Sequence, residues 1–275
     1  METILIPVDF SPASYNASIY AAELARLLKA KLLLFHAYML PTPVSEVPYV
    51  MITVDELQKE NEGLIKKDAE KLHENFGVEV EWLVRIGIPS DETKAITEER
   101  DISMIVIGMR GAGGLDKIIG STTTNVIRKV TTPVLIIPHD STFQTIKNIT
   151  YASDFSYSAS ATLFDPLIEI ITLFSARIHI IHVKKENGNN NDNAKQELGK
   201  ERINEYFKNI DHEFVTLSDS SIMHGINEYL HTHSSELLVM VAHKHSFFER
   251  VFSKSRTTSM AYETRIPLLV LQDKG

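Results

Sequence analysis

A run of glycines next to small hydroxyl side chains is the part of this 275-residue sequence best suited to chemistry. The segment 108–114 holds four glycines, and Gly120 is followed at once by Ser121 and Thr122. Glycines let a backbone approach a phosphate closely, and N–H groups at a helix N-terminus favour anions. Gly-Lys-Ser/Thr is absent, which excludes an ordinary P-loop. A tight strand-to-helix turn that needs glycine for its geometry alone is the competing interpretation.

Asp9 is the carboxylate best placed to act beside that glycine segment, because it ends the first expected strand. It could accept hydrogen bonds from a ribose or hold a metal ion on phosphates. Stabilisation of the following helix N-terminus is the alternative role. We find no catalytic set, since Ser121 has no evident His and Asp partners and Gly-x-Ser-x-Gly is absent. The close histidine pairs at 231/233 and 243/245 are interpreted as surface residues, so no metal site is predicted.

The elements that must position these residues alternate between short apolar strands and amphipathic helices. Ser11 is a good N-cap and Pro12 a good first residue for the first helix. We expect strands at 4–8, 32–35, 78–84, 104–108 and 134–137, and helices from Pro12 to about Leu28 and at 55–76, 91–100 and 121–129. Apolar strands joined by crossover helices predict a parallel sheet covered on both faces. Ligands of such sheets bind beyond the carboxyl ends of the strands.

The chain also repeats itself in the same order along its length. Three matches carry the repeat: Ile4–Ser11 with Ile149–Ser156, Ala30–His36 with Ala176–His182, and Thr132–Ile137 with Ile266–Leu271. The repeat predicts an α/β protein of two tandem doubly wound domains, 1–140 and 145–275, each with a five-stranded mostly parallel sheet. Each copy ends in a very apolar strand whose exposed edge would invite pairing. We therefore expect the copies to pack as an intramolecular pseudo-dimer, and a homodimer of whole chains stays open.

Composition narrows the possible partners. Acidic residues exceed basic ones by 36 to 28, giving a formal charge of −8, which argues against nucleic acid or an anionic membrane as a partner. The sequence has no cysteine, which excludes disulfides and thiolate metal sites. Its apolar runs are too short to span a membrane, and the N-terminus lacks the pattern of a secretory signal. A cytoplasmic protein is the expectation.

Taken together, these motifs resemble the universal stress protein family in a tandem form. The motifs that carry the resemblance are Pro7-Val8-Asp9-x-Ser11, the strand ending in His36, Gly108-x-x-Gly111, Gly120-Ser121 and Thr132–Ile136. The resemblance implies a stress-response protein that holds ATP or a related adenine nucleotide as a regulatory ligand. It implies that Gly108, Gly111, Gly120 and Ser121 line the phosphates. It also implies that Asp9 lies near the ribose and Ala37 near the adenine.

Two departures from the family pattern bear on that ligand. Nucleotide-binding members have nine residues between the second and third glycines, whereas this chain has eight. In the second copy Ala242, His245 and Lys254 replace the glycines and only Ser255 is kept. We therefore expect the first domain alone to bind nucleotide. An interaction protein that binds no nucleotide, and a slow ATP hydrolase, stay open as alternatives.

Magnesium is expected to accompany ATP if ATP binds. The cations nearest the glycine segment are Arg110 and Lys117, which are few for a triphosphate. A magnesium ion that bridges phosphates and keeps several waters would supply the missing positive charge. Asp9 is the nearest plausible carboxylate to such an ion or to the ribose, whereas Asp154, its counterpart in the second copy, is expected to serve its local turn.

Overall fold

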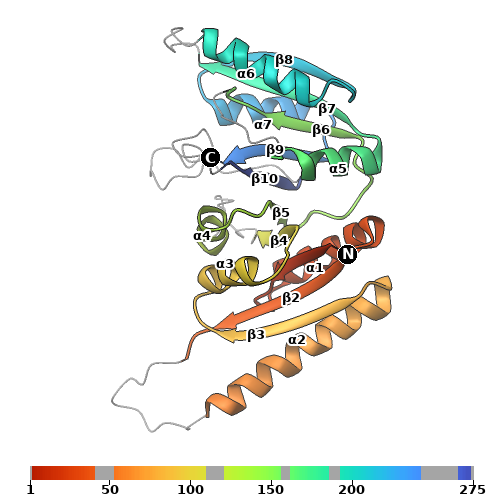
Figure 1. The fold of residues 1–275 in the computed structure, drawn as a ribbon, viewed down its shortest axis with the longest axis vertical. Helices are drawn as coiled ribbons and strands as arrows, with labels where there is room; N and C mark the ends of the chain where they lie inside the picture. The colour runs from red at the N-terminus through yellow and green to blue at the C-terminus, as the bar shows by residue number, and fades with distance from the viewer. Residues whose placement is uncertain are drawn as a thin grey trace.

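The computed structural model describes residues 2–40, 53–109, 121–155, 162–185, 193–242 and 266–273. Within these residues one sheet runs the length of the molecule, with helices on both of its faces (Figure 1). The strand order is β3-β2-β1-β4-β5-β10-β9-β6-β7-β8. Neighbouring strands are parallel at every described pairing except β5 with β10.

The first half of the molecule is the part that runs from β1 to β5. Its elements are β1 (Thr3–Pro7), α1 (Pro12–Leu28), β2 (Lys31–Tyr38), α2 (Val54–Phe76), β3 (Val80–Ile86), α3 (Pro89–Glu99), β4 (Met104–Met109), α4 (Ser121–Lys129) and β5 (Val134–Pro138). Ser11 caps α1 by accepting a hydrogen bond from the Ser14 N–H, as its position before Pro12 predicts. β2 is longer than predicted: it reaches Tyr38, so Ala37 belongs to the strand rather than following it.

The second half runs from β6 to β10 and repeats this topology. Its elements are β6 (Asn148–Ala152), α5 (Asp165–Phe174), β7 (Arg177–Lys185), α6 (Asn193–Tyr206), β8 (His212–Asp219), α7 (Ile222–Thr232), β9 (Leu237–Ala242) and β10 (Leu268–Gln272). The order β8-β7-β6-β9-β10 matches β3-β2-β1-β4-β5 strand for strand. The predicted fold class, two doubly wound α/β units in one chain, is therefore confirmed.

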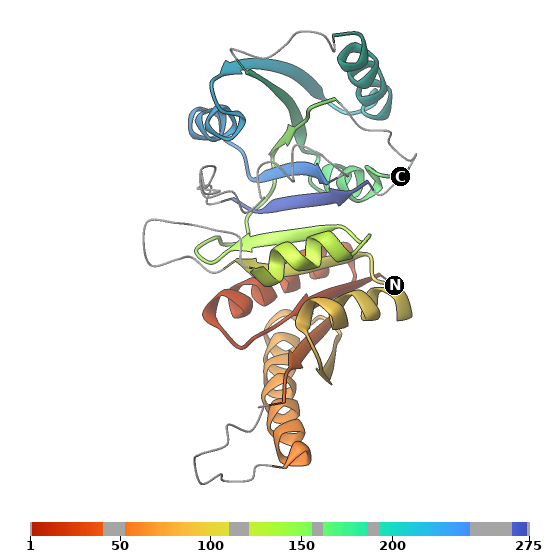
Figure 2. The same cartoon turned by 90° about the vertical axis from the view of Figure 1, so that its left-hand side faces the viewer.

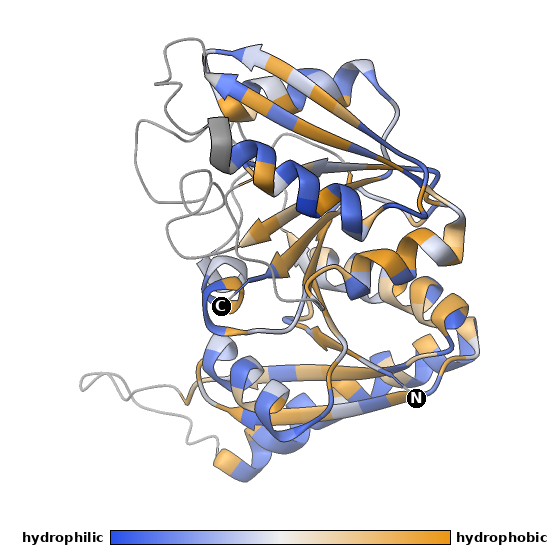
Figure 3. Ribbon diagram, turned by 45° about the horizontal axis from the view of Figure 1, so that its top comes forward, coloured by the Kyte–Doolittle hydropathy of each residue, from blue (hydrophilic) through white to orange (hydrophobic). Residues whose placement is uncertain are grey.

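The helices form one layer on each face of the sheet. Residues of α1, α2, α5 and α6 share one hydrophobic cluster with one face of the strands, and residues of α3, α4 and α7 share a second cluster with the other face. The turned view shows these layers on either side of the sheet (Figure 2). Hydrophobic residues follow the strands, whereas hydrophilic residues colour the outer sides of the helices (Figure 3). Burial on both faces explains why central strands such as β1, β5 and β9 are almost entirely apolar, whereas the edge strands β3 and β8 are only partly buried and carry charged residues.

The two halves meet through their last strands, as predicted. β5 and β10 pair antiparallel, with Leu135 opposite Leu269 and Val134 opposite Val270. Leu135 and Leu269 hold equivalent positions in the repeat, so the pairing is self-complementary, as it is across a two-fold axis. The segment between the halves is held against α1, where the Asn16 side-chain amide donates hydrogen bonds to the carbonyls of Pro138 and Ser141.

Candidate functional site

The carboxyl ends of β2, β1 and β4 bring three of the candidate site residues into one row. β1 pairs in parallel with β2, Pro7 lying opposite Phe35, and with β4, Leu5 lying opposite Ile105. If the β1–β2 register is continued past its last pair, Asp9 lies beside Ala37. If the β1–β4 register is continued in the same way, Val8 lies beside Gly108. The chain leaves β1 toward β2 on one side and reaches β4 on the other side. The row therefore lies at the point where strand order reverses, which is where open α/β sheets bind ligands.

The turn after β1 fixes the position of Asp9. The Asp9 side chain is exposed, and its Oδ1 accepts a hydrogen bond from the Ser11 N–H at 3.1 Å. Phe10 has a φ of 59°, in the left-handed region that a residue with a Cβ rarely adopts. Its ring lies 4.5 Å from the ring of His36, whose Nδ1 is 2.8 Å from the Val8 carbonyl oxygen. These contacts hold the strained turn in place.

The second half builds the same turn from its matching residues. Phe155 has a φ of 58°, and its ring stacks on the His182 ring with the centroids 4.9 Å apart. The Nδ1 of His182 lies 2.8 Å from the Ser153 carbonyl oxygen. These contacts give His36 and His182 a structural role at the two turns. Because both halves keep this turn, it belongs to the fold and does not by itself distinguish a ligand site.

Close packing between β4 and α1 explains why residue 108 is a glycine. A Cβ added at Gly108 would lie 2.4 Å from the carbonyl oxygen of Ala13 and 3.0 Å from the Ser14 nitrogen. The start of α1 therefore sits directly on the backbone of β4, and any side chain at Gly108 would push it away. At the equivalent position Ala242 ends β9 and carries a methyl group, so the second half cannot pack a helix this closely at that point.

The N-terminus of α4 presents hydroxyl groups at the same edge of the sheet. α4 starts after the carboxyl end of β4 and returns to start the parallel strand β5, so its N-terminus lies at the carboxyl edge. Ser121 and Thr122 are exposed there, and the first turn holds no acidic residue. The last turn holds Arg128 and Lys129. The first turn therefore carries no negative charge that would repel an anion from the positive end of the helix dipole.

Contacts with α3 hold α4 in this position. The Lys129 ammonium forms an ion pair with Asp91 and donates a hydrogen bond to the Ser90 hydroxyl, both on α3. Val126 and Ile127 pack in the cluster beneath the two helices. These contacts with α3 and the core orient α4, and none of them involves the glycine segment.

Several candidate residues lie outside the described residues. In the first half these are Gly111 and Gly120 with the nearby cations Arg110 and Lys117, and in the second half they are His245, Lys254 and Ser255. Among the residues that the structure describes, no group of three or more His, Asp or Glu side chains is arranged to hold a metal ion. Within the same residues, no helix is long and apolar enough to cross a membrane.

Comparison with known proteins decides the family. A model of the universal stress protein family matches residues 1–138. The chain belongs to the universal stress protein family. A universal stress protein of Methanocaldococcus jannaschii is 28% identical over 142 residues, which cover 49% of this chain and 80% of the relative. One from Bacillus subtilis is 31% identical over 147 residues, covering 49% of this chain and 97% of the relative.

A solved structure extends the likeness to the whole chain. The crystal structure of a universal stress protein from Archaeoglobus fulgidus superposes with a TM-score of 0.75 at 20% identity, covering 98% of each chain. At that identity the match shows the fold. The likeness in fold therefore includes the second half of this universal stress protein, although the family model matches residues 1–138 alone.

Sequence reasoning missed the residues on the other side of the turn after β1. Phe10, Ser14 and Ser18 line a cavity there together with Asp68 and Lys71 of α2. Phe10 lies in the turn before α1, Ser14 and Ser18 are buried on α1, and Asp68 and Lys71 follow ordinary helical spacing on α2, so no motif indicated them. Trp82, the one tryptophan of the sequence, lies in the edge strand β3 with 38% of its surface exposed.

Proposed function

We propose that this universal stress protein binds ATP or a related adenine nucleotide in its first half, as a regulatory ligand. The observation that carries the proposal is the convergence of Asp9, Ala37 and the N-terminus of α4 at the point where strand order reverses. The adenine would lie against Ala37 and the ribose beside Asp9. The phosphates would lie at Ser121 and Thr122, with Gly111 and Gly120 lining them.

Three features of the described residues fit an adenine nucleotide. The Ala37 side chain is a single methyl on the face of the sheet covered by α3 and α4, small enough for a planar base to lie against it. The Asp9 carboxylate is exposed at the edge of the sheet. The first turn of α4 combines exposed hydroxyls with no acidic residue. A triphosphate would bring more negative charge to a chain of net charge −8, so we propose that magnesium binds with it.

The proposal is limited to the first half. With Ala242, His245 and Lys254 at the glycine positions, side chains would project into the space that phosphates need in the second half. We propose that the second half serves as the partner of an intramolecular pseudo-dimer, with domains at 1–140 and 145–275. We also place the protein in the cytoplasm, because its sequence contains no cysteine for disulfides.

A second candidate function is an interaction protein that binds no nucleotide. The packing of Gly108 favours it, because the contact with Ala13 accounts for that glycine without any phosphate. The shortened spacing of eight residues between Gly111 and Gly120 points the same way. A slow ATP hydrolase is the third candidate, and it differs from a regulatory site only in turnover.

Calorimetric titration of the full chain with ATP and magnesium separates these functions. We expect binding to the wild type, loss of binding in Gly111→Val, and unchanged binding in His245→Val at the matching position of the second half. Valine at Gly111 would place a side chain in the phosphate space, whereas His245 already carries one. No heat of binding to the wild type would favour the interaction protein. Equal loss in both variants would refute the restriction to the first half, and steady release of ADP would indicate a hydrolase.

A further inference from the structure

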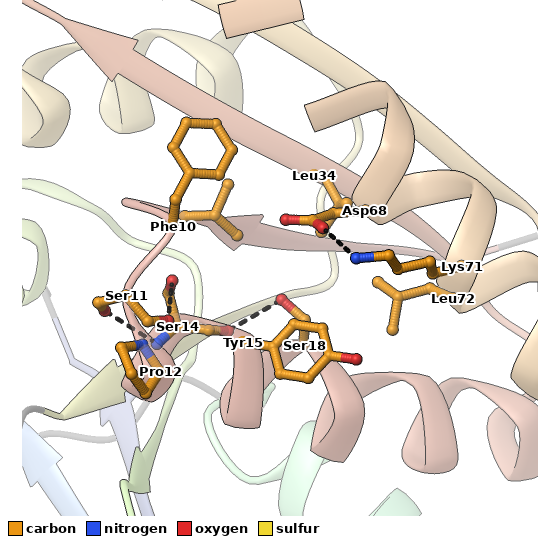
Figure 4. Close-up of a pocket in the computed structure, with 11 residues that line it drawn as sticks. Phe10, Ser11, Pro12, Ser14, Tyr15, Ser18, Leu34, Asp68, Lys71 and Leu72 are labelled. Atoms are coloured by element: carbon orange, nitrogen blue, oxygen red, sulfur yellow. Dashed lines mark hydrogen bonds and ion pairs between the residues drawn. The ribbon is translucent and has the colours of Figure 1, made fainter. Parts of the chain in front are cut away.

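A second cavity in the first half lies on the sheet face opposite to α3 and α4. It has a volume of about 410 Å³ and opens between α1 and α2 at the carboxyl end of β1 (Figure 4). Leu34 and Leu72 belong to the cluster that packs on α1 and α2, whereas Ala37 packs with the cluster on the other face. The cavity is therefore separate from the proposed nucleotide site, although both adjoin the turn after β1.

The two halves differ at this place, although their β1 and β6 turns are alike. In the second half α6 packs directly on the turn, where a Cβ added at Gly199 would lie 2.1 Å from the carbonyl oxygen of Phe155. In the first half α2 stands away from the corresponding Phe10, and the space between them is the cavity. The cavity is thus not a general consequence of the fold, because in the second half the same topology closes the gap, with Gly199 at the point of contact.

The inner wall of the cavity is apolar. Val8 and Leu34 come from neighbouring strands β1 and β2, and Leu72 comes from α2. Leu34 and Leu72 are almost fully buried, so their positions are fixed by the surrounding core. Phe10 closes one end, where its ring is held by His36. This wall fits an apolar group of modest size, because the volume lies at the low end of that for small-molecule sites.

The opening of the cavity carries both signs of charge. Asp68 and Lys71 project from α2 and form an ion pair of 3.5 Å, with 30% and 46% of their side chains exposed. An exposed pair of this kind contributes little to stability, so a ligand can replace it at small cost. A ligand of single charge would meet one of these groups as a like charge, whereas a ligand with both charges can satisfy the two together.

Hydroxyl groups of α1 form the remaining polar part of the cavity lining. The Ser18 hydroxyl donates to the Ser14 carbonyl at 2.9 Å, so toward a ligand its oxygen serves as an acceptor. Tyr15 lies on the α1 side of the cavity, across from Lys71, and is exposed (Figure 4). α1 therefore offers an acceptor suited to an ammonium group and a phenol that can donate to a carboxylate.

We propose that this cavity binds a small zwitterion with an apolar side chain, of which an apolar α-amino acid is the simplest example. The ammonium group of the ligand would bind Asp68 and the Ser18 oxygen. Its carboxylate would bind Lys71 and the Tyr15 hydroxyl, and its side chain would pack on the half-buried Val8 and Phe10, with Leu34 and Leu72 directly beneath. The proposal does not depend on nucleotide binding.

Methyl-labelled NMR of the full chain tests the site and the ligand class together. The probes are L-leucine and L-phenylalanine, with 3-methylbutylamine and 4-methylpentanoate as analogues that keep one charge each. We expect both amino acids to shift the methyl resonances of Val8, Leu34 and Leu72, with affinities at least about tenfold tighter than those of the analogues. Unshifted methyl groups at about 10 mM amino acid, well above a millimolar dissociation constant, would overturn the proposal. So would equal affinity for either analogue.

Charge variants on α2 provide the matched control. Asp68→Asn and Lys71→Met should each weaken binding of L-leucine at least about tenfold, because each removes one of the two charges that the ligand meets. Lys66 and Glu70 form a second exposed ion pair on the same helix, 3.9 Å apart and outside the cavity lining. Lys66→Met and Glu70→Gln should leave the affinity unchanged. Equal weakening in all four variants would contradict the site, because it would indicate an effect of helix charge alone.

Discussion

Gly108 lies beside Val8, the residue before Asp9, across the β1–β4 boundary, and Gly108 and Asp9 each have a local structural role. Gly108 lets the first turn of α1 approach β4, since a methyl there would lie 2.4 Å from the Ala13 carbonyl oxygen. Asp9 accepts a hydrogen bond from the Ser11 N–H and so stabilises the turn that leads into α1. Both residues would therefore be kept in a chain with no ligand, and only variants that separate folding from binding can distinguish the two roles.

Replacing Gly108 should lower stability whether or not nucleotide is present. Gly108→Ala is expected to reduce the free energy of unfolding by about 1–3 kcal/mol, because α1 must shift to admit the methyl group. Gly63 in α2 is the control, since a Cβ there meets nothing within 4 Å. Gly63→Ala should raise the free energy of unfolding by about 0.5–1 kcal/mol through helix propensity. Urea unfolding measures both, and a neutral Gly108→Ala would contradict the packing argument.

Asp9 should matter for nucleotide binding and Asp154 should not. Asp9→Ala removes the carboxylate nearest to the proposed ribose and magnesium, so the affinity for ATP should fall. Asp154→Ala changes the equivalent position in the half whose glycines are replaced, and the affinity should stay at the wild-type value. Titration with ATP, with and without magnesium, measures both effects. Unchanged affinity in Asp9→Ala, or tight binding that is indifferent to magnesium, would count against the assigned role.

Among the secondary-structure elements, helix ends are where sequence and structure agree best. Thr53 and Glu56 form a capping box at the start of α2, and the hydrogen bonds from Thr53 hold the pKa of Glu56 below its usual range. The predicted bounds of α4, 121–129, are the observed ones. Such signals are local, and so they can be read from the sequence. The distance between α2 and the turn after β1 depends on packing across the sheet, which explains why the cavity could not be predicted.

The connection from β8 to α7 should show a measurable pH dependence. The Asp219 carboxylate lies 2.7 Å from the His224 Nδ1 and raises the pKa of His224. The Ser221 N–H, followed by His224, lowers the pKa of Asp219. The histidine's stabilising contribution is complete below its unfolded pKa of about 6.5 and is lost as pH rises through the folded value. The aspartate's contribution is present above about pH 4 and is lost as pH falls.

His224→Gln should therefore lower the melting temperature most near about pH 5, between the two unfolded pKa values, and least near about pH 9. The effect should be modest because His224 is exposed. In the Asp219→Asn background, where the carboxylate partner is absent, His224→Gln is the control and should show no such pH dependence. Melting curves over this pH range measure the difference between variants. A loss for His224→Gln that is as large at pH 9 as at pH 5 would contradict the ion pair.

For the whole molecule, the main structural feature is the self-complementary contact between β5 and β10. It turns two five-stranded units into one sheet and covers the apolar edge that each unit would otherwise expose. The sequence predicted this contact from the hydrophobic character of both last strands. It could not predict the register, because Leu135 opposite Leu269 depends on how two strands from different halves align.

A double-mutant cycle tests this contact between the halves. Leu135 and Leu269 are both buried, so Leu135→Ala and Leu269→Ala should each lower the free energy of unfolding by about 2–5 kcal/mol. Because the two residues are opposite each other, the double variant should depart from additivity by about 0.5–3 kcal/mol. Urea unfolding of the four proteins measures the coupling. Strict additivity would indicate that the two strands do not meet in solution.

Repeats and periodicity thus predicted most of the fold, whereas the site was predicted only in part. The fold class and the order of elements follow from local patterns that recur in both copies. The role of Gly108 cannot be predicted in this way. A glycine that lets a helix approach and a glycine that lets a phosphate approach look identical in the sequence. Its contact with Ala13 is long-range, joining residues about a third of the chain apart, and becomes evident only in three dimensions.

The measurement that tests the central claim most directly is urea unfolding of the full chain in increasing ATP with magnesium. A ligand that binds the folded state alone adds about 2.7 kcal/mol to the free energy of unfolding at one hundred times its dissociation constant. We predict that the unfolding midpoint of the wild type rises with ATP concentration in this manner, and that the midpoint of Gly111→Val does not. A wild-type midpoint that stays constant at millimolar ATP would contradict nucleotide binding by this universal stress protein.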